Sequence, residues 1–237
     1  AAFRYACEQG HIEIAQWLHS LGKINIHANN DYAFRYACGN GHVQLAQWLH
    51  SLGDINIHAN DEQAFIDVCS HGDLELTKWL YKVGVDTSSP IDIHKEYEKA
   101  FRSACQNGYE NLAKWLYQIG IDTNRSVNIH AGGYMNSFYL ACYNGYLRIA
   151  IWLYQLGIEI NEPFVVDDDT FRFVCSKGHK NIAEWFCQIT PINIHVEDEY
   201  AFRWACKGGY KDTAKWLYSL EVINIHARNN EACLLYT

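Results

Sequence analysis

Hydrophobic and polar positions along the chain follow two helical patterns within a short block. In AFRYAC, Phe34, Ala37 and Cys38 fall on one narrow stripe at about 100° per residue, which predicts a first amphipathic helix. In the stretch that follows, apolar residues have the spacing i, i+3, i+4, i+7 of a second helix, at Leu45, Trp48, Leu49 and Leu52. Gly41 and Gly53 are placed to end the two helices.

This block recurs seven times with four fixed landmarks. Phenylalanine opens each copy, and cysteine, glycine and tryptophan follow four, seven and fourteen residues later. The opening residues are Phe3, Phe34, Phe65, Phe101, Phe138, Phe171 and Phe202, so the copies are spaced by 31 to 37 residues. All variation in length falls between one tryptophan and the next phenylalanine. A partial eighth copy, residues 223–237, carries Cys233 in the phenylalanine position.

The links between copies, such as INIHANND, alternate apolar and polar residues and predict short β-hairpin-like arms. Two helices of this length cannot bury both apolar stripes alone, but stacked neighbours can. We therefore expect an all-α solenoid of helix-turn-helix units with about seven repeats plus a partial eighth. It would form a single continuous array over residues 1–237, with repeat cores beginning near residues 3, 34, 65, 101, 138, 171 and 202.

The repeat resembles the ankyrin repeat. AFRYAC stands where that family has TPLHLAA, and GHVQLAQWLHSLG stands where it has GHLEVVKLLLEHG. The segments YAFRYAC, AQWLHSLG and INIHA resemble the ankyrin-repeat variant found in large DNA viruses of amoebae. The resemblance implies a rigid scaffold whose concave groove and hairpin tips bind another protein. It also allows a substrate-adaptor role, for example toward ubiquitin-ligase machinery, although no residue here supports that step.

Two departures from the family pattern concern the ends of the helices. The Thr-Pro start of the first helix is absent, so we expect acids three residues before phenylalanine to favour the helix N-terminus: Asp31, Glu98, Asp168 and Glu199. Copies six and seven lack the closing glycine. Four arginines follow these acids at i,i+4 spacing, which favours ion pairs Asp31/Arg35, Glu98/Arg102, Asp168/Arg172 and Glu199/Arg203 over a basic surface for an acidic partner.

Composition and charge bear on the partner. The chain has 237 residues, 49% hydrophobic, and a formal charge of -8, so a packed core is expected and disorder is not. A net-acidic chain is a poor generic partner for nucleic acid or an anionic membrane. No apolar run approaches the roughly 20 residues of a membrane span, and no signal peptide is visible.

Cysteine and histidine invite a metal or redox interpretation, which their spacing disfavours. Seven cysteines share one position of the repeat, and stacked helices lie about 8–10 Å apart, beyond disulfide reach. We expect small buried apolar side chains and a reducing compartment, the cytoplasm or a host cytoplasm. Cys187 and Cys233 are expected as free thiols. The link histidines are expected to hydrogen-bond neighbouring repeats: His27, His58, His94, His130, His195 and His226.

Chemically distinctive residues are nearly all repeated, whereas a catalytic site is normally unique. No nucleophile, base and orienting group stand together, so we expect no enzyme, no cofactor and no metal.

The positions that vary between copies are the candidates for recognition. Two residues after phenylalanine, opposite the buried stripe, stand Tyr5, Tyr36, Asp67, Ser103, Leu140, Phe173 and Trp204, with Tyr143 beside them. Exposed aromatics on a rigid surface favour protein binding, although drift at lax positions is the alternative. The longer links, 84–100, 120–137 and 157–170, add Glu96, Tyr97, Tyr134, Asp167 and Asp168. Their acids fit either helix capping or attraction of a basic partner.

These patterns favour a protein-recognition scaffold. The alternative is a structural element that self-associates end to end, or a fragment of a longer array, because neither end shows a polar capping repeat.

Overall fold

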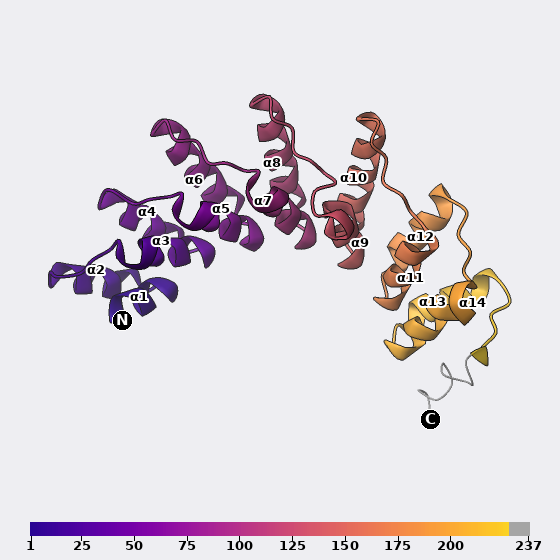
Figure 1. Ribbon diagram of the computed structural model, residues 1–237. Coiled ribbons are helices and arrows are strands. Elements are labelled where there is room, and N and C mark those ends of the chain that lie inside the picture. The colour runs from indigo at the N-terminus through magenta and orange to yellow at the C-terminus, as the bar shows by residue number, and fades with distance from the viewer. Residues whose placement is uncertain (228–237) are drawn as a thin grey trace. The chain divides into compact units, whose positions relative to one another are not determined.

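The computed structural model describes residues 1–227. Over these residues the chain forms fourteen α-helices arranged as seven pairs (Figure 1). It divides into two compact units, Ala1–Gly132 with four helix pairs and Gly133–Thr237 with three. One continuous array over residues 1–237 stays a prediction. Cys233 and most of the partial eighth copy lie outside the described residues.

Each repeat supplies a first and a second helix. The first unit contains α1 (Ala2–Glu8), α2 (Ile12–Ser20), α3 (Ala28–Gly39), α4 (Val43–Ser51), α5 (Ala59–His71), α6 (Leu74–Asp86), α7 (Lys95–Gln106) and α8 (Glu110–Asp122). The second contains a 3-10 turn (Gly133–Met135), α9 (Ser137–Tyr143), α10 (Leu147–Glu159), α11 (Asp168–Ser176), α12 (Lys180–Ile189), α13 (Val196–Lys207) and α14 (Lys211–Leu220).

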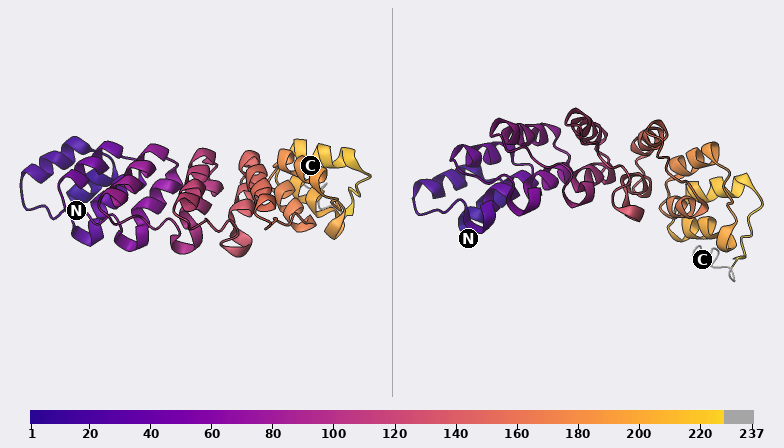
Figure 2. Two further views of the ribbon diagram at one scale, coloured as in Figure 1. Left: turned by 90° about the horizontal axis from the view of Figure 1, so that it is seen from above. Right: turned by 45° about the horizontal axis from the view of Figure 1, so that its top comes forward.

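First helices pack side by side within each unit, and each second helix packs on its own first helix (Figure 2). The predicted stripe forms the core of the stack. The repeat phenylalanines are buried except Phe202, which is half-buried, and all seven cysteines of the repeat position are buried. Burial raises the pKa of the Cys7 thiol to about 12, so it packs as a small protonated group.

Within each unit, tryptophans of the second helices contact the preceding repeat and lie outside the core, at Trp48, Trp79, Trp115, Trp185 and Trp216. Trp48 is half-buried, with its ring 6.5 Å from Phe3 and edge-on to His19 at 5.7 Å. Leu45 and Leu49 fill the buried side of the same helix. Tryptophan therefore joins one repeat to the one before it.

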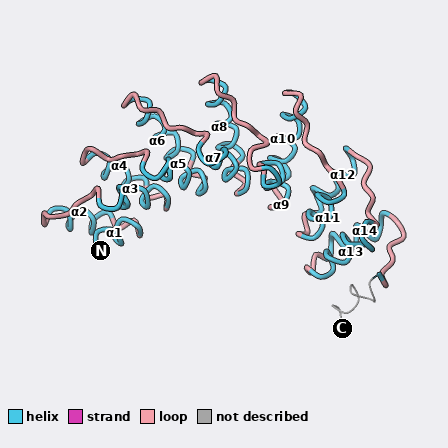
Figure 3. Tube along the Cα trace, in the orientation of Figure 1, coloured by secondary structure: helices cyan, strands magenta, loops and turns pink. Residues whose placement is uncertain are grey.

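The expected hairpin arms are wrong: over residues 1–227 the tube of Figure 3 shows helices and loops without a strand. At the start of α3, α5, α7 and α13, where the link enters the helix, the chain instead makes one left-handed turn of three non-glycine residues, with φ between 50° and 65°. These turns are 29–31, 60–62, 96–98 and 197–199. Left-handed backbone costs roughly 1–2 kcal/mol per residue, so side chains must hold the turn in place.

In three of these turns an arginine side chain donates hydrogen bonds to backbone carbonyl groups of the turn. Arg35 donates from Nε to the carbonyl oxygen of Asn30 at 2.8 Å and from a terminal nitrogen to that of Asn29 at 3.1 Å. Arg102 and Arg203 make the same two kinds of bond in their own turns. The expected Asp31–Arg35 ion pair is therefore wrong, because the guanidinium satisfies strained backbone carbonyls instead.

The expected pair Asp168/Arg172 is also wrong. The link before α11 lacks the three-residue left-handed turn, and Arg172 reaches Asp169 in its own helix and Glu197 of the next repeat, the latter at 2.7 Å. Asp168 is occupied by a backbone N–H of the following link.

A carboxylate in each of five links clamps one repeat to the next. The carboxylate of Asp31 accepts the backbone N–H of Asn56 at 3.1 Å, across the joint. Its other oxygen bonds Nδ1 of His27 at 2.8 Å within its own link. We call the five acids that accept such a backbone N–H the clamp carboxylates: Asp31, Glu62, Glu98, Asp168 and Glu199.

Histidines of the links hydrogen-bond the clamp carboxylates. The expected bond to a neighbouring repeat is present at His58, whose Nε2 lies 3.0 Å from Ser89 Oγ, and at His195, whose Nε2 lies 2.8 Å from Glu221. Nδ1 of both rings faces the clamp carboxylate of the same link. The bond to Glu199, and then that to Glu221, raises the pKa of His195.

The longer links extend the second helix. The helices α6, α8 and α10 each run 13 residues, against 9 in α2 and α4, and continue through a glycine that was expected to end them. At Gly84 an added Cβ would lie 2.8 Å from the carbonyl oxygen of Ser89, so only glycine allows the returning loop to pack there.

Removing a clamp carboxylate should loosen one joint. Glu98 is buried and bonds both His94 and the backbone N–H of Asn128. Glu98→Ala leaves both donors unsatisfied and should lower the free energy of unfolding by about 1–3 kcal/mol, measured by urea unfolding. The control is Glu96→Ala in the same turn, an exposed acid paired with Lys99, which should cost less than about 0.5 kcal/mol. Equal losses in both variants would contradict the clamp.

Candidate protein-recognition surface

The face of the first helices opposite the buried stripe carries most of the residues selected from the sequence. Tyr5, Tyr36 and Phe173 are exposed there, Tyr5 to 65% and Phe173 to 43%. Four more are half-buried, namely Asp67, Ser103, Tyr143 and Trp204. We call this surface of each unit its recognition face, defined by the residues two, five and six positions after each repeat phenylalanine.

Leu140 does not belong to this surface. Its side chain is only 3% exposed, so the expectation that it faces solvent is wrong. The helix α9 is short, begins at the N-cap Asn136 without the turn of three left-handed non-glycine residues, and packs against α11. Burial of the leucine side chain is favourable here because it removes apolar surface from water. Tyr139 takes its place on the surface, half-buried.

An aromatic pair lies on the first unit's recognition face. Tyr32 stacks on Tyr36 with ring centroids 3.9 Å apart, and the guanidinium of Arg4 lies 5.2 Å from the centroid of Tyr32. The Tyr32 hydroxyl donates to a carboxylate oxygen of Glu8 at 3.4 Å. Rings held by stacking and a cation lose little freedom when a partner binds.

In the second unit the aromatic groups on α9 and α11 meet. Tyr139 stacks on Tyr143 at 6.0 Å and meets Phe173 edge-on at 6.1 Å. The ammonium nitrogen of Lys177 lies 4.6 Å from the centroid of Tyr143. A hydrogen bond with Tyr143 raises the pKa of Lys177, so this lysine stays charged.

A second group lies on α13. Tyr200 stacks on Trp204 at 5.4 Å, and the ammonium nitrogen of Lys207 lies 4.2 Å from the Trp204 ring centroid. The guanidinium carbon of Arg172, on α11, lies 5.0 Å from the centroid of Tyr200. Cations therefore accompany every aromatic group of this unit's recognition face.

The residues chosen from the long links have mixed roles. Tyr97 and Tyr134 are exposed, and Glu96 is paired with Lys99. Asp167 caps α11 by accepting from the backbone N–H and the hydroxyl of Thr170, at 2.9 and 2.8 Å. Asp168 is a clamp carboxylate. These acids were expected either to cap a helix or to attract a basic partner. Asp167 and Asp168 both have partners within the chain, which favours a structural role for these two.

Sequence reasoning missed Tyr32, Tyr139 and Tyr200. The first and third stand two residues before phenylalanine, four before Tyr36 and Trp204. Residues four apart share one face of a helix, so the recurring pair of aromatics was a signal that could have identified them. Tyr139 stands in the position that arginine holds in other copies.

Residues 1–227 contain neither a candidate metal-binding cluster nor a candidate membrane-spanning helix. Within this range no group of three or more histidine, cysteine or acidic side chains is placed to hold a metal ion. No helix of the described part is long and apolar enough to cross a membrane.

The same repeat position should behave in opposite ways in two neighbouring repeats. Leu140→Ala empties a buried site and should lower the free energy of unfolding by about 2–5 kcal/mol. Phe173→Ala removes a ring exposed to 43% and should cost far less. Chemical unfolding followed by circular dichroism distinguishes the two, and a Phe173→Ala variant as unstable as Leu140→Ala would refute the assigned surface.

Comparison with protein-family models agrees with this architecture. A model described as ankyrin repeats (many copies) matches residues 3–50, and one described as ankyrin repeats (3 copies) matches residues 34–127 and 65–164. No curated protein matches the chain. Helix pairs, repeat spacing and family models agree, and the chain belongs to the ankyrin repeat family.

Proposed function

We propose that the chain is a scaffold that recognises another protein through the recognition faces of its first helices. Ankyrin repeats are in general protein–protein interaction modules. The observation that carries the proposal is the exposure of Tyr5, Tyr36 and Phe173 on helices whose fixed residues already account for the stack. Large aromatics on free surface suit the central anchors of an interface.

The faces are suited to binding because they are held in place beforehand. Stacking, cation contacts and helix packing fix Tyr36 and Trp204 before a partner arrives. Binding then orders few side chains, which lowers its entropic cost. In an adaptor role the captured protein would be presented to a further domain.

The seven buried thiols favour a reducing compartment such as the cytoplasm. The INIHA links resemble those of ankyrin repeats from large DNA viruses of amoebae, which favours the cytoplasm of a host cell.

Affinity capture from amoebal lysate tests this proposal. The parent chain is compared with the variant Tyr36→Ala, Phe173→Ala, Trp204→Ala. The control removes three aromatic rings elsewhere, with Tyr97→Ala, Tyr134→Ala, Tyr218→Ala. We expect at least one protein to be retained by parent and control and reduced about tenfold or more by the face variant, as for loss of an interface anchor. Equal recovery by the face variant contradicts recognition by this face.

Self-association is a second candidate, favoured by one observation. Trp17 is 60% exposed, whereas Trp48 packs on the preceding repeat. Tyr218 is also exposed. It holds the repeat position of Tyr81, whose ring packs edge-on against Trp115 of the next repeat. Trp17 holds the repeat position of Trp115, so Trp17 and Tyr218 correspond to two rings that contact each other across a joint. A second copy would join them head to tail.

Sedimentation velocity over a wide concentration range tests this second candidate. The apparent mass should rise with concentration for the parent and stay that of a monomer for Trp17→Glu, because a charge at the joint opposes stacking. A parent chain that remains monomeric throughout refutes self-association and leaves the recognition proposal untouched.

A further inference from the structure

We infer that the recognition face of the second unit binds an acidic protein segment, with two carboxylates held by Lys177 and Lys207 and an apolar side chain held by Phe173. The inference rests on the proposed function and names the partner's chemistry. It starts from the sign of the charges that stand beside the aromatic groups.

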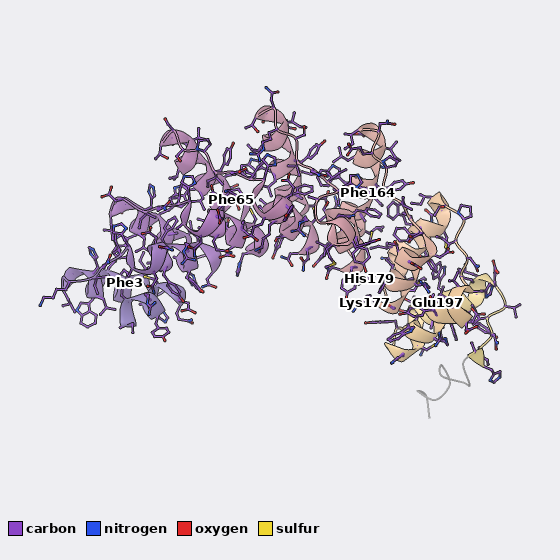
Figure 4. All side chains as sticks on the ribbon, in the orientation of Figure 1. Phe3, Phe65, Phe164, Lys177, His179 and Glu197 are labelled. Atoms are coloured by element: carbon purple, nitrogen blue, oxygen red, sulfur yellow. The ribbon has the colours of Figure 1, made fainter. Side chains whose placement is uncertain are left out.

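Each of two consecutive first helices presents an aromatic ring followed by a lysine about one turn later. At α11 the pair is Phe173 and the C-cap residue Lys177, and on α13 it is Trp204 and Lys207. Residues three or four apart lie on the same side of a helix, so ring and ammonium group face the same partner. Lys177 is labelled in Figure 4.

The two lysines are available to a partner. Within residues 1–227 neither ammonium group is in an ion pair. Lys177 contacts the ring of Tyr143 and hydrogen-bonds with that residue, and Lys207 contacts the ring of Trp204. The arginines of the same helices are occupied: Arg172 by Asp169 and Glu197, and Arg203 by backbone carbonyls. The free positive charge of this face therefore belongs to Lys177 and Lys207.

The corresponding positions of the first unit carry no lysine or arginine, and two of its recognition-face positions are acidic. Glu8 stands five residues after Phe3, where the last repeat has Lys207 after Phe202. Asp67 takes the position of Phe173 and Trp204. A positive face on a chain of net charge -8 is a local exception, and such patches give specificity for a partner of opposite sign.

Helix spacing sets the spacing of acids in the partner. Adjacent packed helices lie about 8–10 Å apart, and α11 packs against α13. An extended chain advances about 3.3 Å per residue, so carboxylates about three residues apart would reach the two lysines. An apolar residue beside the first acid would cover the exposed ring of Phe173. The expected segment is extended and has two acidic residues with an apolar one nearby.

Selection from a phage-displayed library of random peptides tests the inference on the whole chain. We expect enriched peptides to carry two Asp or Glu residues about three apart with an apolar neighbour. By fluorescence anisotropy, Lys177→Glu, Lys207→Glu should weaken their binding about tenfold or more, and added salt should weaken it for the parent. Lys177→Gln, Lys207→Gln should give a smaller loss.

The control has the same change of net charge elsewhere in the unit. Lys211 and Lys215 are exposed on α14, a second helix, and Lys211→Glu, Lys215→Glu should leave the affinity within about twofold. Melting followed by circular dichroism verifies that all variants fold, because lysine near a helix C-terminus also favours the helix.

Three outcomes separate this inference from the proposed function. Enriched peptides that lack acids, or that bind the Lys177→Glu, Lys207→Glu variant as well as the parent, overturn the inference. If such peptides still lose affinity with Phe173→Ala, Trp204→Ala, recognition by this face stands and only the partner's chemistry is wrong. A selection that gives no peptide dependent on either pair contradicts both.

Discussion

A buried carboxylate that accepts a backbone N–H from the next repeat is the interaction on which this structure depends. At Glu98, one group satisfies His94 of its own link and Asn128 of the following one. It can do so because a left-handed turn directs the side chain inward, and Arg102 satisfies the carbonyls that the turn exposes. Strain in the turn is thereby offset by bonds that also fix the distance between repeats.

This arrangement separates the residues that build the stack from those free to vary. Phenylalanine, cysteine and the clamp carboxylates face inward or across the joints, and tryptophan covers the joints from the second helix. The outer side of each first helix contributes little to that framework, so Asp67 and Trp204 can share one position of the repeat. A rigid frame with a variable surface is the property that recognition of a protein requires.

The helix pairs could be predicted because periodicity and glycine positions are local signals: Phe34, Cys38 and Leu49 are buried as their spacing indicates. The links could not, because alternating INIH suggests a strand, and three left-handed residues in a row contradict ordinary propensity. Position in the repeat also predicted the exposure of three aromatic residues, Tyr5, Tyr36 and Phe173. The placement of Leu140 and Tyr139 could not be predicted in this way, because in the short helix α9 Leu140 is buried and Tyr139 is half-buried at the surface.

Native-state hydrogen exchange at the joints tests the clamp most directly. The N–H groups that clamp carboxylates accept lie in loops, where amides normally exchange fast: Asn56, Asp92, Asn128, Asn193 and Asn224. We predict that NMR will show all five protected, and that Glu98→Ala will release Asn128 while Asn56 stays protected. Exchange of all five at the rate of free loop amides would contradict the account.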